Sequence, residues 1–520
     1  MDIVENKALR IRTRNPDKFK IIPKHHVQAI EGGYEVTVYW GLDEARVLKN
    51  LGVKDVPSPI ERKYQWPGRY LPMSHQKATA GFVTLHRRGF VFNDPGTAKT
   101  MSALWAADYL MKRGDVRRCL IICPLSIMQS AWMGDIMNSV MHRSAVVAHH
   151  AQSTRRIEMI QDDYEFVIIN YDGLNLVADE IVADGRFDMV IVDEANAYGV
   201  STTKRWKSLA KILRPDTFLW MMTGTPAAQS PVNAYGLAKL VNPSAVPPYL
   251  TAWRDKVMNK ISTFKWVPKP NAKELVFAAL QPAIRFAKKD CLDLPPVLKT
   301  TREVPMTAQQ AKYYEKIKTD MLVVAAGQTI SAVNKAAVVN KLLQISCGGV
   351  YSEDGEVVEF DATPRMNLLL EILAETDRKV LIFAMYRSSI DAIMTFLTKH
   401  GVSVGVIHGG IPANKRGDII NMFQNTPLPQ VMLMQPQATA HGITLTAADT
   451  VVFFGPLMSV ELYTQCIARA DRKGQTSDKV TVIHIQSSPV EKKMFAAMDL
   501  RVTDHALLTQ MFDEEMEINT

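Results

Sequence analysis

The sequence predicts an α/β protein of two tandem lobes, each a doubly wound parallel sheet, preceded by a small α+β module. Four short apolar runs, "CLIICP", "FVIINYD", "FDMVIVDE" and "FLWMMTGTP", have the length of strands, and each is followed by a helix-like segment. A second series, "KVLIFAMY", "VSVGVIH", "PQVMLMQP", "DTVVFFGP" and "KVTVIHIQ", repeats this organisation later in the chain. Unbroken apolar strands that alternate with helices are typical of parallel sheets covered on both faces.

The segments around the two series set the expected domain boundaries. A strand, strand and helix pattern lies between Phe19 and Gly52, and a stretch rich in Pro and Lys, without strand-like runs, extends from Pro243 to Pro305. We therefore expect an N-terminal accessory module (1–65), a first lobe (66–290), a second lobe (291–490) and a helical, acidic tail (491–520).

The composition excludes several classes of protein. Hydrophobic residues make up 47% of the 520 residues and charged residues 22%, which is typical of globular domains. The five cysteines form no C-x-x-C pair, which favours a reducing, cytoplasmic setting without structural zinc. We expect no secretory signal and no membrane segment, because no apolar run approaches about 18 residues. The net charge of +8 is compatible with a nucleic-acid partner and also with an ordinary basic protein.

The stretch "FVFNDPGTAKTMS", residues 90–102, is similar to a phosphate-binding loop of pattern G-x-x-x-x-G-K-[ST]. It lies between a predicted strand and a predicted helix, where free backbone N–H groups favour phosphate. Asn93 and Ala98 replace the two glycines, and Ala98 is tolerated at little cost if its backbone is right-handed. A surface turn before a helix is the alternative interpretation. The residues predicted to bind ATP are Asn93, Asp94, Pro95, Gly96, Thr97, Ala98, Lys99 and Thr100.

Two further groups of polar residues suit phosphoryl transfer. A predicted strand ends in Asp193, which together with Thr100 would hold Mg²⁺, while Glu194 would polarise the attacking water. A solvated acidic pair at a strand end is the alternative. Lys99 would supply a charge to the β- and γ-phosphates of ATP.

The stretch "YTQCIARADRKGQ" places Gln465, Arg469 and Arg472 at i, i+4 and i+7, so that a helix would present them on one face. Two planar guanidinium groups suit a transferring phosphoryl group, although a solvated basic face would show the same spacing. These residues belong to the second lobe and Lys99 to the first. ATP is therefore expected between the lobes, with hydrolysis dependent on their closure.

With these groups identified, residues 70–495 resemble the superfamily-two helicase-type ATPases of the Swi/Snf class, which contain two RecA-like lobes. "LPMSHQKATAGFV" resembles the adenine-recognition segment, with Gln76 as the adenine reader, and "MMTGTPAAQSP" resembles motif III. The ending "ADRKGQ" is that of this class rather than of RNA helicases, and "LLQISCGGVYSEDG" is similar to compact phage and bacterial members. Coupling between the ATP and DNA sites is implied for Asn196, Thr223, Gly224 and Thr225.

The resemblance also implies a DNA partner, contacted through its phosphate backbone. The DNA contacts it implies, from motifs Ia, Ib, IV and V, are Ser126, Tyr171, His408, Gly409 and Thr444. The basic N-terminal stretch "RIRTRNPDKFKIIPKHH" is expected either near DNA or at a solvated strand edge. A small module before the lobes is similar to that of annealing-helicase relatives. The chain departs from the family pattern at Ala98, at Asn196, where histidine is usual, and at Thr439 and Ala440, which replace a glycine pair.

These features predict a DNA-dependent ATPase that uses ATP and Mg²⁺ to translocate on duplex or branched DNA, in remodelling, replication, recombination or repair. One alternative is an ATP-binding module that binds DNA or a partner without hydrolysis, with Ala98 and Asn196 as its marks. Another is an RNA-dependent helicase, which the ending of motif VI disfavours. The sequence identifies no protein partner and no preferred DNA structure.

Overall fold

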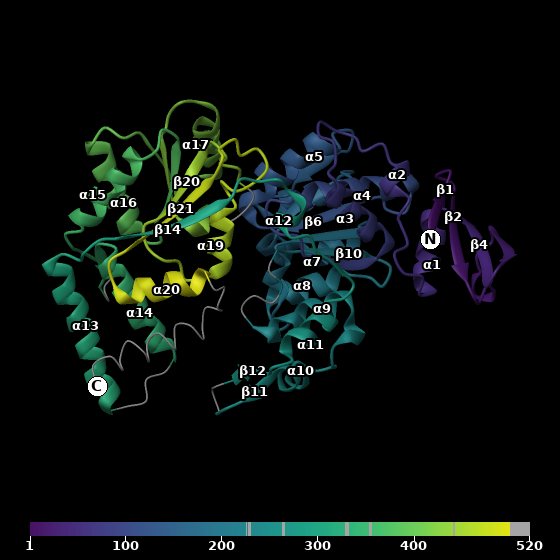
Figure 1. Cartoon of the computed structure of the whole chain (residues 1–520), viewed down its shortest axis with the longest axis horizontal. Helices are drawn as coiled ribbons and strands as arrows, with labels where there is room; N and C mark the ends of the chain where they lie inside the picture. Colours follow the sequence, from purple (N-terminus) through teal and green to yellow (C-terminus); the bar gives the residue numbers. More distant parts are fainter. Residues whose placement is uncertain are drawn as a thin grey trace. The chain divides into compact units, whose positions relative to one another are not determined.

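The chain divides into two units, unit 1 (Met1–Cys291) and unit 2, which begins at Leu292 (Figure 1). The computed structural model describes residues 1–224, 226, 230–262, 266–327, 332–352, 356–439 and 443–499. Each unit contains one large, all-parallel sheet with helices on both faces, as two RecA-like lobes require. The predicted fold class is thus confirmed.

The sheet of unit 1 has seven strands in the order β13-β5-β10-β9-β6-β8-β7, and every neighbouring pair is parallel. Its strands are β5 (Arg88–Val91), β6 (Cys119–Cys123), β7 (Ala145–Val147), β8 (Phe166–Asn170), β9 (Met189–Asp193), β10 (Phe218–Met222) and β13 (Ala283–Ile284). Alternate side chains of the central strands enter two separate cores. Both faces are therefore buried, which explains why these strands are unbroken apolar runs.

Helices cover the two faces of this sheet in separate layers. One core contains residues of α3 (Ser74–Leu85), α4 (Lys99–Arg113) and α5 (Gly134–Ser139). The other core contains residues of α6 (Ser153–Gln161), α7 (Tyr171–Asp184), α8 (Lys204–Ile212), α9 (Ala234–Val241), α10 (Leu250–Val257) and α11 (Ala272–Ala279). The remaining short elements are α2 (Ile60–Lys63), α12 (Lys288–Cys291) and the hairpin of β11 (Met258–Lys260) and β12 (Trp266–Pro268).

The N-terminal module is a four-stranded antiparallel sheet in the order β1-β2-β4-β3, followed by α1 (Leu42–Asn50). Its strands are β1 (Asp2–Val4), β2 (Ala8–Thr13), β3 (His25–Ile30) and β4 (Gly33–Tyr39). The sequence predicts strands only between Phe19 and Gly52, so β1 and β2 were missed. β2 alternates buried Leu9 and Ile11 with exposed arginines, and this polar, half-buried pattern differs from the apolar runs of the large sheets.

The sheet of unit 2 has six parallel strands in the order β14-β21-β20-β17-β19-β18. They are β14 (Val297–Glu303), β17 (Lys379–Phe383), β18 (Val404–Ile407), β19 (Val431–Met434), β20 (Ala448–Phe453) and β21 (Val480–Gln486). The expectation that Pro243–Pro305 lacks strands is wrong, because β11, β12, β13 and β14 lie in it. These strands are short or at sheet edges, and most of their side chains are partly or fully exposed, so they contain no buried apolar run.

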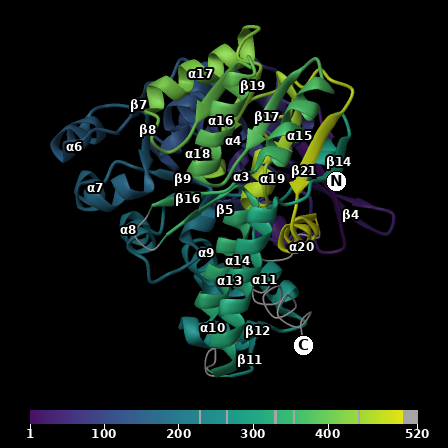
Figure 2. The same cartoon turned by 90° about the vertical axis from the view of Figure 1, so that its left-hand side faces the viewer.

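The helices of unit 2 surround this sheet, and α13 and α14 lie side by side (Figure 2). They are α13 (Ala308–Gly327), α14 (Ala332–Ser346), α15 (Thr363–Ala374), α16 (Arg387–Lys399), α17 (Ala413–Asn425), α18 (Pro436–Thr439), α19 (Val460–Ile467) and α20 (Pro489–Asp499), with a small hairpin of β15 (Gly349–Tyr351) and β16 (Val357–Glu359). The predicted acidic end of the tail, 500–520, lies outside the described residues. In the described part of the chain, no helix has the length and apolar character needed to cross a membrane.

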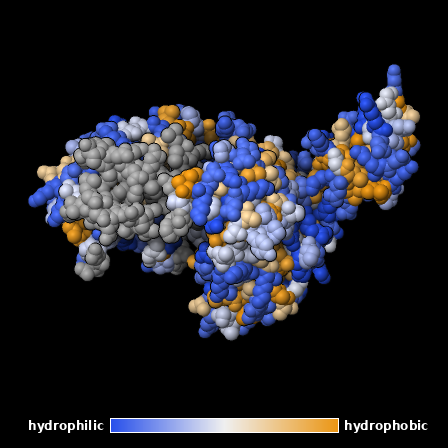
Figure 3. Space-filling model, turned by 90° about the horizontal axis from the view of Figure 1, so that it is seen from below, coloured by the Kyte–Doolittle hydropathy of each residue, from blue (hydrophilic) through white to orange (hydrophobic). Residues whose placement is uncertain are grey.

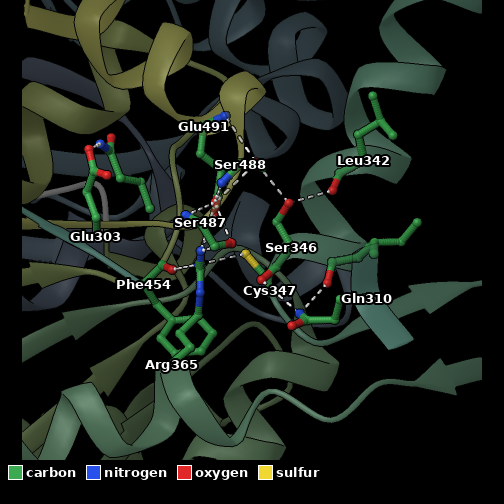
Figure 4. A network of polar contacts seen from close by, with 12 residues as sticks. Glu303, Gln310, Leu342, Ser346, Cys347, Arg365, Phe454, Ser487, Ser488 and Glu491 are labelled. Atoms are coloured by element: carbon green, nitrogen blue, oxygen red, sulfur yellow. Dashed lines mark hydrogen bonds and ion pairs between the residues drawn. The ribbon is translucent and has the colours of Figure 1, made fainter. Parts of the chain in front are cut away.

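A buried ion pair joins α15 to α20, near the end of unit 2 (Figure 4). The guanidinium of Arg365 on α15 donates to both carboxylate oxygens of Glu491 on α20, each at 2.8 Å, and both side chains are almost fully buried. Arg365 also donates to the Phe454 carbonyl at the end of β20. The Glu491 carboxylate accepts backbone N–H bonds from Ser487 at 2.7 Å and Ser488 at 3.1 Å. The pair therefore fixes α20 against the end of the sheet.

Replacing Glu491 by glutamine should destabilise unit 2, because it leaves the Arg365 charge buried without its counter-charge. Removing one partner of a buried pair costs about 3–5 kcal/mol. Chemical denaturation of the full chain should show a lower midpoint for the unit 2 transition and an unchanged unit 1 transition. The control is Glu303→Gln, which breaks an exposed pair with Lys492 and should have little effect. Equal effects of the two substitutions would show that burial of the pair is unimportant.

Candidate functional site

The predicted phosphate loop, residues 92–98, connects β5 to the first turn of α4 and is anchored from several sides. Asn93 donates to the Thr79 hydroxyl at 2.9 Å and accepts the Phe286 N–H at 3.0 Å, while the Asp94 N–H donates to the Phe286 carbonyl at 3.1 Å. Asn93, at the first glycine position, is thus completely buried and anchors the loop. The segment after β13 was not predicted to support it.

Ala98 adopts a left-handed backbone, with φ +55° and ψ +42°, immediately before α4 begins at Lys99. From the sequence, we expected alanine to be tolerated at position 98 only if its backbone were right-handed. The backbone is left-handed, so this condition is not met. A left-handed conformation costs a residue with a Cβ about 1 kcal/mol or more. Gly96 is also left-handed, with φ +89°. The loop therefore passes through left-handed backbone at Gly96 and Ala98, as a glycine-rich turn does, directly before the first N–H groups of α4, which have no acceptor within the helix.

Two adjacent side chains at the start of α3 support the loop from behind. The Gln76 amide donates to the Ala98 carbonyl at 3.2 Å and accepts the Met73 N–H at 2.9 Å. The Nε2–H of His75 donates to the Thr97 carbonyl at 2.9 Å. Both side chains are 2% exposed. Gln76 is thus located at the loop, and its role as adenine reader stays a prediction. The contact of His75 with the loop was not predicted from the sequence.

Asp193 ends β9 and is 5% exposed. One carboxylate oxygen accepts the Trp132 indole N–H at 3.1 Å, and the other accepts the Glu194 N–H at 3.0 Å. Burial raises the pKa of the Asp193 carboxyl, and the positive charge of Lys99 is the main opposing influence. The fold therefore brings Lys99, at the start of α4, and Asp193, at the end of β9, close enough for their charges to interact.

A magnesium ion fits the chemistry of these groups. Mg²⁺ bound with a nucleotide takes one or two protein oxygens and several from phosphates and water. Asp193 keeps unused lone pairs on both oxygens, and Thr100 lies in the first turn of α4. No group of three or more His, Cys, Asp or Glu that could hold a metal occurs among the described residues. The donor set thus suits Mg²⁺ bound together with ATP.

The loops after the other strands of unit 1 converge on the same edge. The Tyr171 hydroxyl donates to the Asp193 carbonyl at 2.7 Å, so this predicted DNA contact also supports the backbone of the acidic pair. A Cβ on Gly224 would lie 2.7 Å from the Pro95 ring, which shows that the loop after β10 packs against the phosphate loop. Thr223 is completely buried, whereas Ser126 is exposed after β6.

The remaining coupling residues are only partly described. Asn196 lies in the single turn Ala195–Tyr198 that follows Glu194, and Glu194 itself is left-handed with φ +47°. Thr225 lies outside the described residues, and its predicted role, like that of Asn196, stays a prediction. Ala440, one of the two residues that replace the glycine pair of motif V, also lies outside them.

The three polar residues of unit 2 do not share a helical face as predicted. Helix α19 carries Gln465 but ends at Ile467, and both arginines follow it in a series of turns. The turns nevertheless bring the arginines together: Arg469 and Arg472 donate to the same carbonyl, that of Ile443, at 3.2 and 3.1 Å. Arg469 is 5% exposed, whereas Arg472 is partly exposed.

The predicted DNA contact Thr444 lies directly beside these arginines. It is exposed, it follows Ile443, and the next residue, Leu445, donates its N–H to the Arg469 carbonyl at 2.9 Å. The loop around Thr444 is also held from α17, where Gln424 donates to the Thr446 hydroxyl at 2.9 Å. Displacement of this loop would therefore act directly on the arginines.

His408 and Gly409 form a separate turn after β18. The His408 Nδ1 accepts the Gly410 N–H at 3.0 Å, and the Gly409 carbonyl accepts from Arg416 at 3.0 Å. Burial and the nearby charge of Arg387 lower the pKa of His408. Both residues lie at the carboxyl edge of the unit 2 sheet and remain candidates for phosphate contact.

Comparisons with known proteins were made for the whole chain. Residues 36–347 match the model of the SNF2-related domain, and residues 364–474 match that of the helicase conserved C-terminal domain. The SWI/SNF-related matrix-associated actin-dependent regulator of chromatin subfamily A-like protein 1 of Drosophila melanogaster is 25% identical over 75% of this chain and 49% of its own length. Putative protein p41 of Acyrthosiphon pisum secondary endosymbiont phage 1 is 22% identical over 77% of this chain and 88% of its own length.

Similar solved structures include the Sulfolobus solfataricus SWI2/SNF2 ATPase core in complex with dsDNA. It is 19% identical and covers 87% of this chain and 95% of that chain, with a TM-score of 0.42. The chain spans about half the length of the animal relatives that it matches, 49% for the Drosophila protein and 48% for a chromodomain-helicase-DNA-binding protein 1-like protein of Mus musculus.

Replacing Ala98 by glycine should relieve the left-handed strain without disturbing Lys99. We expect an unchanged or higher free energy of unfolding, by up to about 1 kcal/mol, and ATP turnover within about tenfold of the wild type. The control is Ala78→Gly inside α3, which should lower stability by about 0.5–1 kcal/mol. Thermal unfolding and steady-state hydrolysis measure both effects. A gain in turnover well above tenfold would show that alanine disables the native loop.

Proposed function

Since the chain belongs to the SNF2-related family of helicase-like ATPases, we propose that it is a DNA-dependent ATPase that translocates on duplex or branched DNA. The observation that carries this proposal is the convergence of Lys99, Asp193 and Glu194 at the edge of one sheet, beside a loop with the backbone of a phosphate-binding turn. A protein that binds ATP without hydrolysing it would use Lys99 and Asp193 but has no need of the Glu194 carboxylate. Remodelling, replication, recombination or repair are the processes we propose for it.

In the proposed reaction, the N–H groups at the start of α4 and the Lys99 ammonium hold the β- and γ-phosphates of ATP. Thr100 and Asp193 hold Mg²⁺, which offsets charge on the phosphates. Glu194, at the end of the strand, orients the attacking water and accepts its proton. Trp132 and the Glu194 N–H keep the Asp193 carboxylate in one orientation.

We propose that the arginines of unit 2 stabilise the transition state of ATP hydrolysis. Arg472 is partly exposed, whereas Arg469 is buried and also donates to the Gln465 carbonyl at 2.8 Å. We therefore infer that Arg472 leaves the Ile443 carbonyl to reach the transferring phosphoryl group, and that Arg469 mainly holds the turn. DNA bound at Thr444 would favour the release of Arg472 from the Ile443 carbonyl. DNA binding would in this way stimulate hydrolysis.

The DNA contacts are proposed at Ser126 and the His408–Gly409 turn, which follow β6 and β18, and at Thr444, in the segment between α18 and β20. Such groups suit the phosphate backbone rather than base edges, so binding should be salt-dependent and nearly independent of sequence. We propose that the protein acts in the cytoplasm, where its five free thiols stay reduced. The strained Ala98 favours one alternative, an ATP-binding module without turnover.

Hydrolysis assays without nucleic acid and with duplex DNA, forked DNA, single-stranded DNA or RNA test the proposal. We expect stimulation by duplex or forked DNA, and a loss of about 10²–10⁴-fold for Glu194→Gln with ATP affinity retained. Lys99→Ala should lose turnover and bind ATP more weakly, because it deletes a charge on the phosphates. A wild-type protein that binds ATP but shows no DNA-stimulated turnover would favour the non-hydrolysing module.

Replacing Arg472 by alanine should lower DNA-stimulated turnover by about 10³–10⁵-fold, the range for an arginine that acts on a transferring phosphoryl group. ATP and DNA affinities should change little, because the effect is on the transition state. The matched control is Lys473→Ala, which removes a neighbouring exposed charge. Near-native DNA-stimulated turnover in the Arg472 variant would contradict the proposed role of unit 2 in hydrolysis.

A further inference from the structure

The N-terminal module has one sheet face that no described element of the module covers. Leu9, Ile11, Val36 and Val38 point to the other face, where they form a core with α1. Because side chains alternate along a strand, the residues between them point away from that core. The cross-strand neighbours on this open face are Arg10 with Thr37 and His26, Arg12 with Glu35 and Gln28, and Ala8 with Tyr39.

The open face is basic and exposed. Arg10, Arg12 and His26 are exposed, and the ammonium groups of Lys24 and Lys63 lie 5.3 and 5.2 Å from the centre of the Tyr39 ring. Hydrophilic residues, interspersed with hydrophobic ones, cover the side of the module seen in Figure 3. Like charges gathered in this way repel each other, and a polyanion relieves the repulsion.

Three carboxylates lie on or beside this face, against the four cations Arg10, Arg12, Lys24 and Lys63, so an excess of positive charge remains. Glu35 pairs with Arg10 at 3.2 Å, and Asp2 lies opposite Arg10 on the edge strand β1. Burial lowers the pKa of Lys63, and the negative charge of Glu44, on α1, opposes this only in part. The Arg10 side chain is 44% exposed, so its pair with Glu35 is weak and open to exchange. Arg12 and Lys24 keep their charges available to a partner.

The module is attached firmly to the unit that carries the ATP site. Arg46 on α1 donates to the Thr84 carbonyl on α3 at 3.1 Å and to Asp115, beyond the end of α4, at 3.3 Å. The Trp40 indole donates to the Pro57 carbonyl at 2.9 Å. Helix α4 begins at the phosphate loop, so a ligand on the module is held at a defined place relative to the ATP site. Strands β1 to β3 precede residue 36, where the match to the SNF2-related domain begins.

We propose that the open face of the module binds the phosphate backbone of DNA, as a second contact separate from the other proposed DNA contacts. The choice of DNA over other polyanions rests on the proposed function of the whole chain. Arg10 and Arg12 are two residues apart on one strand, about 6.6 Å, which matches the spacing of successive phosphates along one DNA strand. The attachment through α1 raises the effective concentration of DNA at both contacts.

The test compares the full-length Arg10→Gln/Arg12→Gln variant with the wild type. Each lost phosphate contact lowers the slope of log affinity against log salt by about 0.9 on duplex DNA. We therefore expect a slope reduced by about 1.8, about tenfold weaker DNA binding at low salt, and unchanged turnover at saturating DNA. The control, Arg117→Gln/Lys399→Gln, removes two exposed charges elsewhere and should leave the slope unchanged. Both substituted arginines are exposed, so thermal unfolding should be unaffected.

An unchanged salt slope in the double variant overturns the inference, and so does a loss that appears with RNA but not with DNA. A wild-type protein without DNA-stimulated hydrolysis, whose DNA binding still weakens with the double substitution, would refute the proposed function and leave this inference standing. A reduced affinity only for single-stranded or only for duplex DNA supports the inference and identifies the form of DNA that is bound.

Discussion

The common carboxyl edge of parallel strands is the constraint on which the candidate site of unit 1 depends. Four parts of it lie at or directly after the end of a strand: the phosphate loop after β5, Asp193 at the end of β9, Gly224 after β10 and Tyr171 after β8. Parallel pairing sends all four strand ends to one edge. Groups far apart in the sequence therefore meet without any long-range charge attraction, and the buried sheet holds their backbone rigid.

Burial at that edge also explains the chemistry of the acidic pair. Taking the Asp193 carboxylate out of water raises its pKa, and Lys99, Trp132 and the Glu194 N–H each favour the charged form. Lys99 is itself 9% exposed. The Lys99 ammonium therefore favours the ionised form of Asp193 before any nucleotide arrives. In unit 2 the Ile443 carbonyl accepts hydrogen bonds from both guanidinium groups.

The buried apolar strands were predictable from the sequence, because fully buried parallel strands leave unbroken runs such as "FDMVIVDE". The family and the elements that carry the site were predictable as well. The strands β2 and β14 were not predictable, because exposed residues interrupt the apolar ones in both, and each resembles a polar segment. Helical spacing also misplaced Arg469 and Arg472, since three or four residues separate neighbours both in a helix and in a series of turns. Side-chain support of the loop by His75 depends on packing between segments and leaves no pattern in the sequence.

The pairing of β14 with β21 affects how the protein is made. Val297, near the start of unit 2, pairs with Val480, near its end, and the register continues to Glu303 and Gln486. During synthesis the early strand leaves the ribosome long before its partner exists, with its hydrogen-bonding edge open. The growing chain can complete unit 1 while the ribosome is still translating, but unit 2 closes only when almost all of it has emerged. The interval between these two events is the period in which the nascent protein is most exposed to aggregation and most in need of chaperones.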